Sequence, residues 1–279
     1  PKHSLPISIK GVQENDYAMI LGFPGSTDRY LSSWGVEQAV SLEQPKRVDI
    51  RGKKLEIMKS YMDQDVDLRL KYSSKYAQVA NYWKYFIGQS EQLKNNKVAD
   101  KKRKIESEFK SFTSGKDLYK DVLSSLENYY KSTNDVINIK TYQSEFIYTV
   151  DANVSAFRYK FWIDAIKGGN ADRATMILGR LNQMVDEYYE NANTELEAKI
   201  IHDVLEMYLR DIPASQMGPL CASIKVKGHK VLDKFFKGLK AKSMFLNKEK
   251  FEAFKANPTE KAMLADPLYK LIMDMNDAH

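Results

Sequence analysis

The first thirty residues carry an alternation of hydrophobic and polar positions that is typical of β-strands. Residues 5–9 alternate with the period of two that marks a half-buried strand. Pro6 places that strand at a sheet edge or at its own beginning. Residues 17–21 are apolar on both faces, and the polar connection 11–16 separates the two segments. We therefore predict an antiparallel hairpin with a long loop within residues 1–30.

After Tyr30 the hydrophobic positions recur every three or four residues, which is the spacing of amphipathic helices. Pro45 is suited to the first turn of one such helix. The apolar stripes that carry this spacing are Leu55/Met58/Met62, Tyr72/Tyr76/Val79/Trp83/Phe86, Leu118/Val122/Leu126, Phe146/Ile147/Val150/Phe157/Phe161/Trp162, Ile177/Leu181/Met184/Tyr188 and Leu196/Ile200/Val204/Tyr208.

Glycine, proline and capping residues predict where several of these helices begin and end. Gly88 and the pair Gly168-Gly169 are suited to helix ends. Thr194 and Glu197 have the spacing of a capping box, and the helix that they open should stop before Pro213. Two or three shorter helices are expected in the lysine-rich end. The fold class is thus mainly α, with more than half of the chain helical.

The change of period divides the chain into two predicted domains, a β-hairpin over residues 1–32 and a helical domain over residues 33–279. The composition, with 43% hydrophobic and 11% aromatic residues, is that of an ordinary soluble globular protein. The longest apolar run, residues 18–21, is far shorter than the roughly 20 residues of a membrane helix. We expect no membrane segment and no signal peptide. A chain that begins at Pro1 is expected to be a processed or excised piece.

Charge and cysteine content add few constraints. The 43 basic and 37 acidic residues give a net charge of +6, which is modest for 279 residues. The basic run at residues 101–104 is followed by Glu106 and Glu108, so we interpret it as a solvated helix face. The single Cys221 has the apolar neighbours Leu220 and Ala222 and is expected to be a buried thiol.

The sequence offers no catalytic set of its own. None of the four histidines is spaced from another as a metal ligand, so we expect no metal site and no cofactor. His202 is expected to be a surface or half-buried histidine. The stretch "YAMILGFPGSTDRY" has no lysine after Gly25, as a phosphate loop requires, and no glycines two residues either side of Ser26, as a nucleophile elbow requires. We interpret it as a tight turn.

Two stretches of this sequence resemble a known family. "GFPGSTDRYLSSWGVE", residues 22–37, and "SSKYAQVANYWKYFIG", residues 73–88, resemble motifs of the bacterial dipeptidyl-peptidases 7 and 11, in the same order and at about the same spacing. "LEIMKSYM" between them fits as well, and the resemblance extends over essentially the whole chain. Ser26 stands where members of that family usually carry arginine.

The resemblance implies a serine peptidase with a chymotrypsin-type double β-barrel, interrupted by a helical insertion that caps the active-site cleft. Such enzymes release dipeptides from the free N-terminus of peptides. This chain would then hold the end of one barrel segment, a β-hairpin remnant, followed by the helical cap. The missing barrel segments of the same chain would carry the triad, with histidine and aspartate before Pro1 and serine after His279. By itself the chain is expected to be inactive.

One substrate-binding residue carries over from the family, the asparagine of its Asn-Tyr-Trp motif, which is Asn81 here. The resemblance implies that Asn81 helps to hold the N-terminal ammonium of the substrate. At about 100° per residue, Asn81 lies near 180° from the apolar stripe of its helix, free to face a cleft. An amide oxygen is a suitable acceptor for an ammonium. The alternative for this residue is a solvent-facing asparagine.

The sequence leaves other interpretations open. A non-enzymatic helical interaction module would also explain the 17 tyrosines and the missing triad. The basic stretch 225–242 could suggest a nucleic-acid binder. Its apolar residues fall at helical spacing, however, so we predict an amphipathic helix and no nucleic-acid partner. By resemblance the protein would be exported to the periplasm or cell surface of a Gram-negative bacterium, and the full-length protein could form a homodimer.

Overall fold

The structure is a computed structural model that describes residues 3–4, 6–19, 21–22 and 27–278. It divides into two units, Pro1–Leu31 and Ser32–His279, and each is described by itself. The glycine-rich turn that we predicted at residues 22–25 falls mainly outside the described residues. The single cysteine, Cys221, is free and buried, as predicted.

The predicted β-hairpin is wrong. No strand occurs among the described residues of the first unit, although Asp16 N–H donates to Gln13 O at 3.1 Å in a turn where a hairpin loop was expected. Ile7 and Ile9, the inward positions of the predicted strand, are 89% and 98% exposed. An alternating pattern marks residues that suit a sheet, but an isolated pair of strands is marginal in water without further strands or a helix to cover it. The fold is therefore mainly α without a sheet in its described part.

The second unit is built from helices, and 78% of the described residues are helical, which confirms the predicted helical content. The elements are α1 (Ser33–Gln38), the π-helix η1 (Ala39–Glu43), α2 (Gln44–Met62), α3 (Val66–Asn95), α4 (Val98–Phe112), the 3₁₀ turn η2 (Asp117–Tyr119), α5 (Val122–Ile147), α6 (Asp151–Lys167), α7 (Ala171–Asn191), α8 (Thr194–Asp211), the 3₁₀ turn η3 (Ala214–Gln216), α9 (Pro219–Lys227), α10 (His229–Lys242), α11 (Lys248–Ala256), α12 (Glu260–Ala265) and α13 (Pro267–Asn276).

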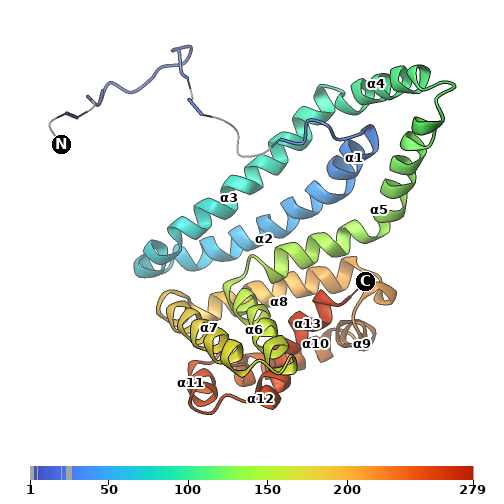
Figure 1. The fold of residues 1–279 in the computed structure, drawn as a ribbon. Helices are drawn as coiled ribbons and strands as arrows, with labels where there is room; N and C mark the ends of the chain where they lie inside the picture. Colours follow the sequence, from blue (N-terminus) through green and yellow to red (C-terminus); the bar gives the residue numbers. More distant parts are fainter. Residues whose placement is uncertain (1–2, 5, 20, 23–26, 279) are drawn as a thin grey trace. The chain divides into compact units, whose positions relative to one another are not determined.

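The two long helices α2 and α3 pack side by side, and α2 also contacts α5 and α8 (Figure 1). Helices α6 to α13 form a second group below α2 in that view, in which α6 packs on α7 and α13 contacts α6 and α9. One continuous core of buried apolar side chains runs through both groups. None of the described helices combines the length and the apolar character that crossing a bilayer requires.

Several helix boundaries match the sequence patterns and others do not. The end at Gly168 and the stop before Pro213 are observed. The predicted end at Gly88 is wrong, because α3 continues to Asn95. Beyond Gly88, the side chains of Gln89 and Ser90 bond to the buried Gln44 of α2, a tertiary contact that outweighs the modest cost of an interior glycine.

The predicted capping box at the start of α8 is also wrong. Asn193 caps the helix, and its side-chain oxygen accepts from Leu196 N–H at 2.9 Å. Glu197 is fully buried and turns inward to other partners instead. At the lysine-rich end, the described chain forms five short helices, α9 to α13, where two or three were expected. Pro219 opens α9, and Asp266 with Pro267 opens α13, so these residues start helices that the apolar spacing alone did not separate.

Candidate functional site

Asn81 lies in the middle of α3, on the face that points away from α2. The buried side of α3 is formed by Leu68, Tyr72 and Val79, which pack into the core with α2. Asn81 itself is exposed, and its side chain makes no hydrogen bond with another described residue. This position agrees with the helical spacing. Whether Asn81 binds substrate stays a prediction.

Trp83 fixes the part of α3 that carries Asn81. Its indole Nε1–H donates to the carbonyl oxygen of Val48 on α2 at 3.1 Å. The close approach depends on Gly52, because a Cβ at that position would lie 3.3 Å from Trp83 Nε1. At 100° per residue, Trp83 and Asn81 point about 160° apart around the helix. One side chain therefore holds the helix while the other faces outward.

A buried carboxylate, Glu145 on α5, ties α2 to the same region. Glu145 Oε1 accepts from Arg47 Nη1 at 2.7 Å and from Arg51 Nη2 at 2.9 Å. The two guanidinium groups also lie over aromatic rings of α3, since Arg51 is 5.2 Å from the ring centre of Tyr82 and Arg47 is 5.5 Å from that of Phe86. Ion pairs and cation–π contacts thus fix the aromatic side of α3 next to Asn81.

Lys54 is the third cation near Glu145, and its side chain is only 1% exposed. Its ammonium donates to the backbone oxygen of Glu145 and to the hydroxyl of Thr149. Its distance to Glu145 Oε2 is 3.8 Å. Burial lowers the pKa of Lys54 to about 8, against the opposing effect of the Glu145 charge. The cluster of cations around Glu145 therefore includes one group that can lose its charge near neutral pH.

A second buried carboxylate, Glu197 on α8, ties the start of α3 to α6. Glu197 Oε1 accepts from Lys75 Nζ at 2.8 Å, and its Oε2 accepts from Ala152 N–H at 3.3 Å. Tyr72 donates to the same carboxylate at 3.4 Å. Burial alone would lower the pKa of Lys75, but Glu197 and Asp151 together raise it above its usual value. Lys75 therefore stays charged in this network.

A groove of about 680 Å³ runs between α3 and the pair α6 and α7. Gln78 and Tyr82, which flank Asn81 in the sequence, contribute to its wall, while Asn81 does not line it. The hydroxyl of Tyr188 is buried at this groove and has no hydrogen-bond partner among the described residues. The lining includes no histidine or cysteine and is formed mainly by polar, charged and aromatic side chains that can serve as binding groups.

The groove and the two buried carboxylates are features that the sequence patterns did not reveal. Glu145 precedes the apolar pair Phe146 and Ile147, and such an acidic residue at the edge of an apolar stripe was the available signal. The spacing of Glu197 was assigned to a cap. Neither pattern indicates which basic side chains of other helices will contact these two carboxylates. The arrangement as a whole can orient α3 and present its exposed face rigidly.

A model of the Peptidase S46 family matches residues 1–279. The chain belongs to this family. It is 34% identical to a dipeptidyl-peptidase 7 of Capnocytophaga gingivalis, over the whole chain and 39% of that protein. It is 38% identical to a dipeptidyl-peptidase 7 of Porphyromonas gingivalis, over 85% of the chain and 32% of that protein. The resemblance seen in the two sequence motifs is confirmed. The S46 chain described here thus spans less than two fifths of the length of these relatives.

Other S46 relatives carry a different name. An Asp/Glu-specific dipeptidyl-peptidase of Flavobacterium psychrophilum is 28% identical over 91% of the chain and 35% of that protein. The fold also matches a crystal structure of Porphyromonas endodontalis DPP11 in complex with the dipeptide Arg-Glu, with a TM-score of 0.74 and 18% identity. That match covers 91% of this chain and 37% of the other. The helical arrangement is therefore one that this family uses.

Proposed function

We propose that this S46 chain supplies the helical cap of a serine-type dipeptidyl-peptidase that releases dipeptides from the free N-terminus of peptides. The observation that carries the proposal is the placement of Asn81 on an exposed face of a firmly anchored helix, in a chain whose family includes dipeptidyl-peptidases. The barrel segments with the catalytic triad would belong to the same full-length protein. The described part of this chain holds the binding surface.

The role we propose for Asn81 is to accept a hydrogen bond from the N-terminal ammonium of the substrate. A fixed acceptor at this point would set how many residues lie between the N-terminus and the scissile bond, which is what makes a dipeptidyl-peptidase. The anchor at Trp83 and the charge clusters around Glu145 and Glu197 support this proposal, because they hold α3 in place. A binding group on a rigid element loses little entropy when the ligand arrives.

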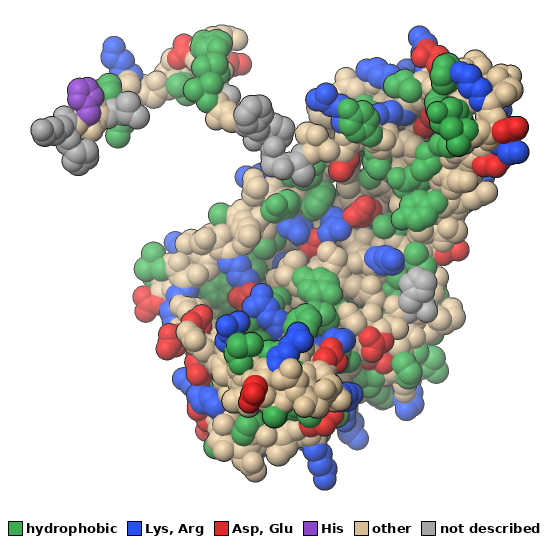
Figure 2. All heavy atoms as spheres, viewed as in Figure 1, with side chains coloured by type: hydrophobic (Ala, Val, Ile, Leu, Met, Phe, Trp, Pro, Cys, Tyr) green, Lys and Arg blue, Asp and Glu red, His purple; other side chains and the backbone are tan. Residues whose placement is uncertain are grey.

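The alternative is a non-enzymatic helical interaction module, and the family membership favours the peptidase over it. A nucleic-acid binder finds little support on the face seen in Figure 2, where basic, acidic and hydrophobic side chains intermingle. By the same resemblance we propose export to the periplasm or cell surface and a homodimer of the full-length enzyme. The chain is similar both to dipeptidyl-peptidase 7 and to Asp/Glu-specific dipeptidyl-peptidases, so the preference at the second substrate residue is left open.

The experiment that tests this function compares two proteins on one unblocked peptide. The full-length protein should release dipeptides, and its activity should disappear after treatment with a serine-directed phosphonate. The 279-residue chain alone should release none, because a serine peptidase needs histidine and serine within hydrogen-bond reach. Dipeptide release by the short chain would contradict the proposal that the catalytic triad lies in the other segments of the full-length protein. A full-length protein without activity on free N-termini would instead favour the interaction module.

A further inference from the structure

Two histidines that lie far apart in the sequence come together on helices α8 and α10. His202 and Glu206 are one turn apart on α8, and His229 and Asp233 are one turn apart on α10. The segments read His-Asp-Val-Leu-Glu and His-Lys-Val-Leu-Asp, so the same spacing of histidine and carboxylate occurs in both. At a spacing of four, each pair projects from one face of its helix.

The contacts between the helices show that these two faces meet. His229 Nδ1 lies 3.6 Å from Glu206 Oε1, and His229 Nε2 lies 3.8 Å from Asp233 Oδ1. The ring centre of His202 is 4.7 Å from that of Phe236, which follows Asp233 by one turn on α10. Helix α10 therefore lies against α8 here, with His229 beside Glu206 and Phe236 beside His202.

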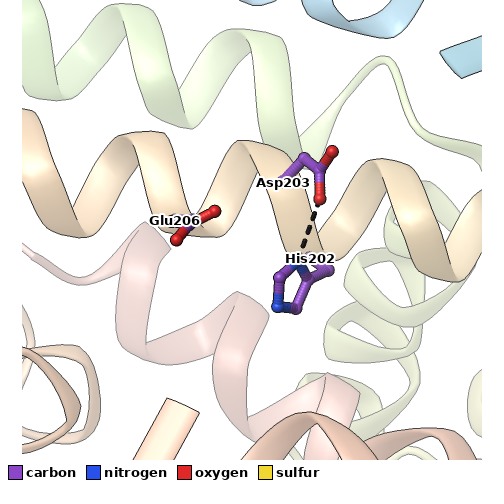
Figure 3. Close-up of side chains that lie close together, drawn as sticks. All are labelled: His202, Asp203 and Glu206. Carbon is purple, nitrogen blue, oxygen red and sulfur yellow. Dashed lines mark hydrogen bonds and ion pairs between the residues drawn. The ribbon is translucent and has the colours of Figure 1, made fainter. Parts of the chain in front are cut away.

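His202 is held in an orientation that leaves one ring nitrogen free. Its Nδ1 is 2.9 Å from Asp203 Oδ1, and the side chains of the two residues are only 18% and 15% exposed. Figure 3 shows the second ring nitrogen pointing away from Asp203. Ligand atoms of His202, Asp203 and Glu206 all lie within 4.8 Å of one another. The free nitrogen and the Glu206 carboxylate can thus face one ion.

We propose that His202, Glu206 and His229 bind a divalent first-row transition-metal ion, with the Glu206 carboxylate, which lies near both imidazoles, as the shared centre of the site. Imidazole and carboxylate together suit Zn²⁺, and three or four such donors satisfy its usual coordination. The side chains of Glu206 and His229 are 51% and 65% exposed, so an ion can enter from solvent and these side chains can adjust to it.

Asp203 fits the part of an outer partner rather than a ligand. It already accepts from Lys199 Nζ at 2.7 Å while it contacts His202 Nδ1. A metal-bound histidine commonly donates its other N–H to a carboxylate, which fixes the ring and strengthens it as a ligand. A bound ion would connect α8 to α10, so it should stabilise the folded chain.

The test is a titration of the 279-residue chain with Zn²⁺ alone, followed by calorimetry, and with Co²⁺, whose visible absorption reports its coordination. We expect one equivalent to bind and the melting temperature to rise with added Zn²⁺, because the ion binds only the folded state well. His202→Asn and His229→Asn should each abolish binding or weaken it at least tenfold. His3→Asn, which changes a histidine far from the site in the sequence, should leave binding unchanged.

A second pair of variants separates the outer partner from the ligands. Asp203→Ala should weaken Zn²⁺ binding about 10- to 100-fold, which is the usual effect of removing such a partner. Asp203→Asn keeps an acceptor for His202 Nδ1–H and should retain most of the affinity. Binding that survives the loss of both His202 and His229, or that disappears with His3→Asn, would overturn the proposal. So would wild-type protein that binds neither ion.

Discussion

The two faces of helix α3 differ in what surrounds them. The side toward the core is fixed by two contacts. The indole N–H of Trp83 donates to the carbonyl oxygen of Val48, and Lys75 forms an ion pair with Glu197. The outward side carries Asn81, which makes no hydrogen bond with the described chain. The comparison teaches that residues of one short motif can face the core and the solvent separately, so stability and any binding can be probed independently. Substitutions on the first face should change folding, and those on the second should change only what the helix binds.

The largest effect is expected at the buried carboxylate of α8. Glu197→Gln leaves the half-buried Lys75 with Asp151 as its main acidic partner, so we expect a cost of about 3 kcal/mol, the lower end of the usual range for a broken buried ion pair. The measurement is the free energy of unfolding in urea. Glu195→Gln is the matched control on the same helix, because its side chain is 63% exposed and pairs only at the surface with Lys240. Equal losses for both variants would contradict the comparison.

The next effect is a change in how stability depends on pH. Lys54 has a folded-state pKa of about 8, below its ordinary value of 10.5. Between these values the unfolded state binds more protons than the folded state, so stability should increase as the pH rises through that window. Below pH 8 the cost of burying the charge is fully present. At about 1.4 kcal/mol per pKa unit, the difference between 10.5 and about 8 corresponds to about 3–4 kcal/mol of destabilisation at low pH.

The measurement for Lys54 is a difference between two proteins. Unfolding free energies of the wild type and of Lys54→Met are compared from pH 7 to pH 10, which cancels the titration of other groups. The wild type should gain on the variant by about 2 kcal/mol as the pH rises over that range. Parallel curves would show that Lys54 stays charged in the folded protein.

A smaller effect is expected at the anchor of the motif. Trp83→Phe keeps an aromatic ring but removes the donor to Val48 O, at a cost of about 1 kcal/mol for the lost hydrogen bond. Thermal or urea unfolding of the 279-residue chain measures this loss. Tyr82→Phe on the same helix is the control, because the Tyr82 hydroxyl makes no hydrogen bond within the described chain and the ring over Arg51 is kept. It should change stability by less than about 0.5 kcal/mol.

The smallest effect on stability is expected at Asn81. Because its side chain is exposed and unbonded within the described chain, Asn81→Ala should change the free energy of unfolding by about 0.5 kcal/mol or less. A large decrease in melting temperature would assign Asn81 to the fold rather than to binding. This variant therefore separates the two faces of α3 by stability before any activity is measured.

The sequence predicted the helical fold and the outward position of Asn81, because both depend on local periodicity. It failed where partners from elsewhere in the chain decide the outcome. The period of two in residues 5–9 marks residues suited to a strand but does not supply the strands that would pair with them. The spacing of Thr194 and Glu197 fits a cap, yet Lys75, more than a hundred residues away in the sequence, takes the Glu197 carboxylate.

The histidine pairs show the same limit. The repeated spacing of His202 with Glu206 and of His229 with Asp233 is visible in the sequence. The spacing of the histidines to one another nevertheless predicted no metal site, because nothing local indicates that α8 and α10 face each other. Long-range packing brings the pairs together, as it does for Glu145 and the arginines of α2.

The most direct test of the central claim is kcat/KM of the full-length enzyme and its Asn81→Ala variant on two peptides, one with a free N-terminus and one blocked. Removing an acceptor from a charged ammonium is worth about 1.5–3 kcal/mol. The account therefore predicts a loss of about 10- to 150-fold for the free peptide. The blocked peptide, which has no ammonium, should show little difference between the two enzymes. An unchanged kcat/KM for the free peptide would contradict the proposed role of Asn81.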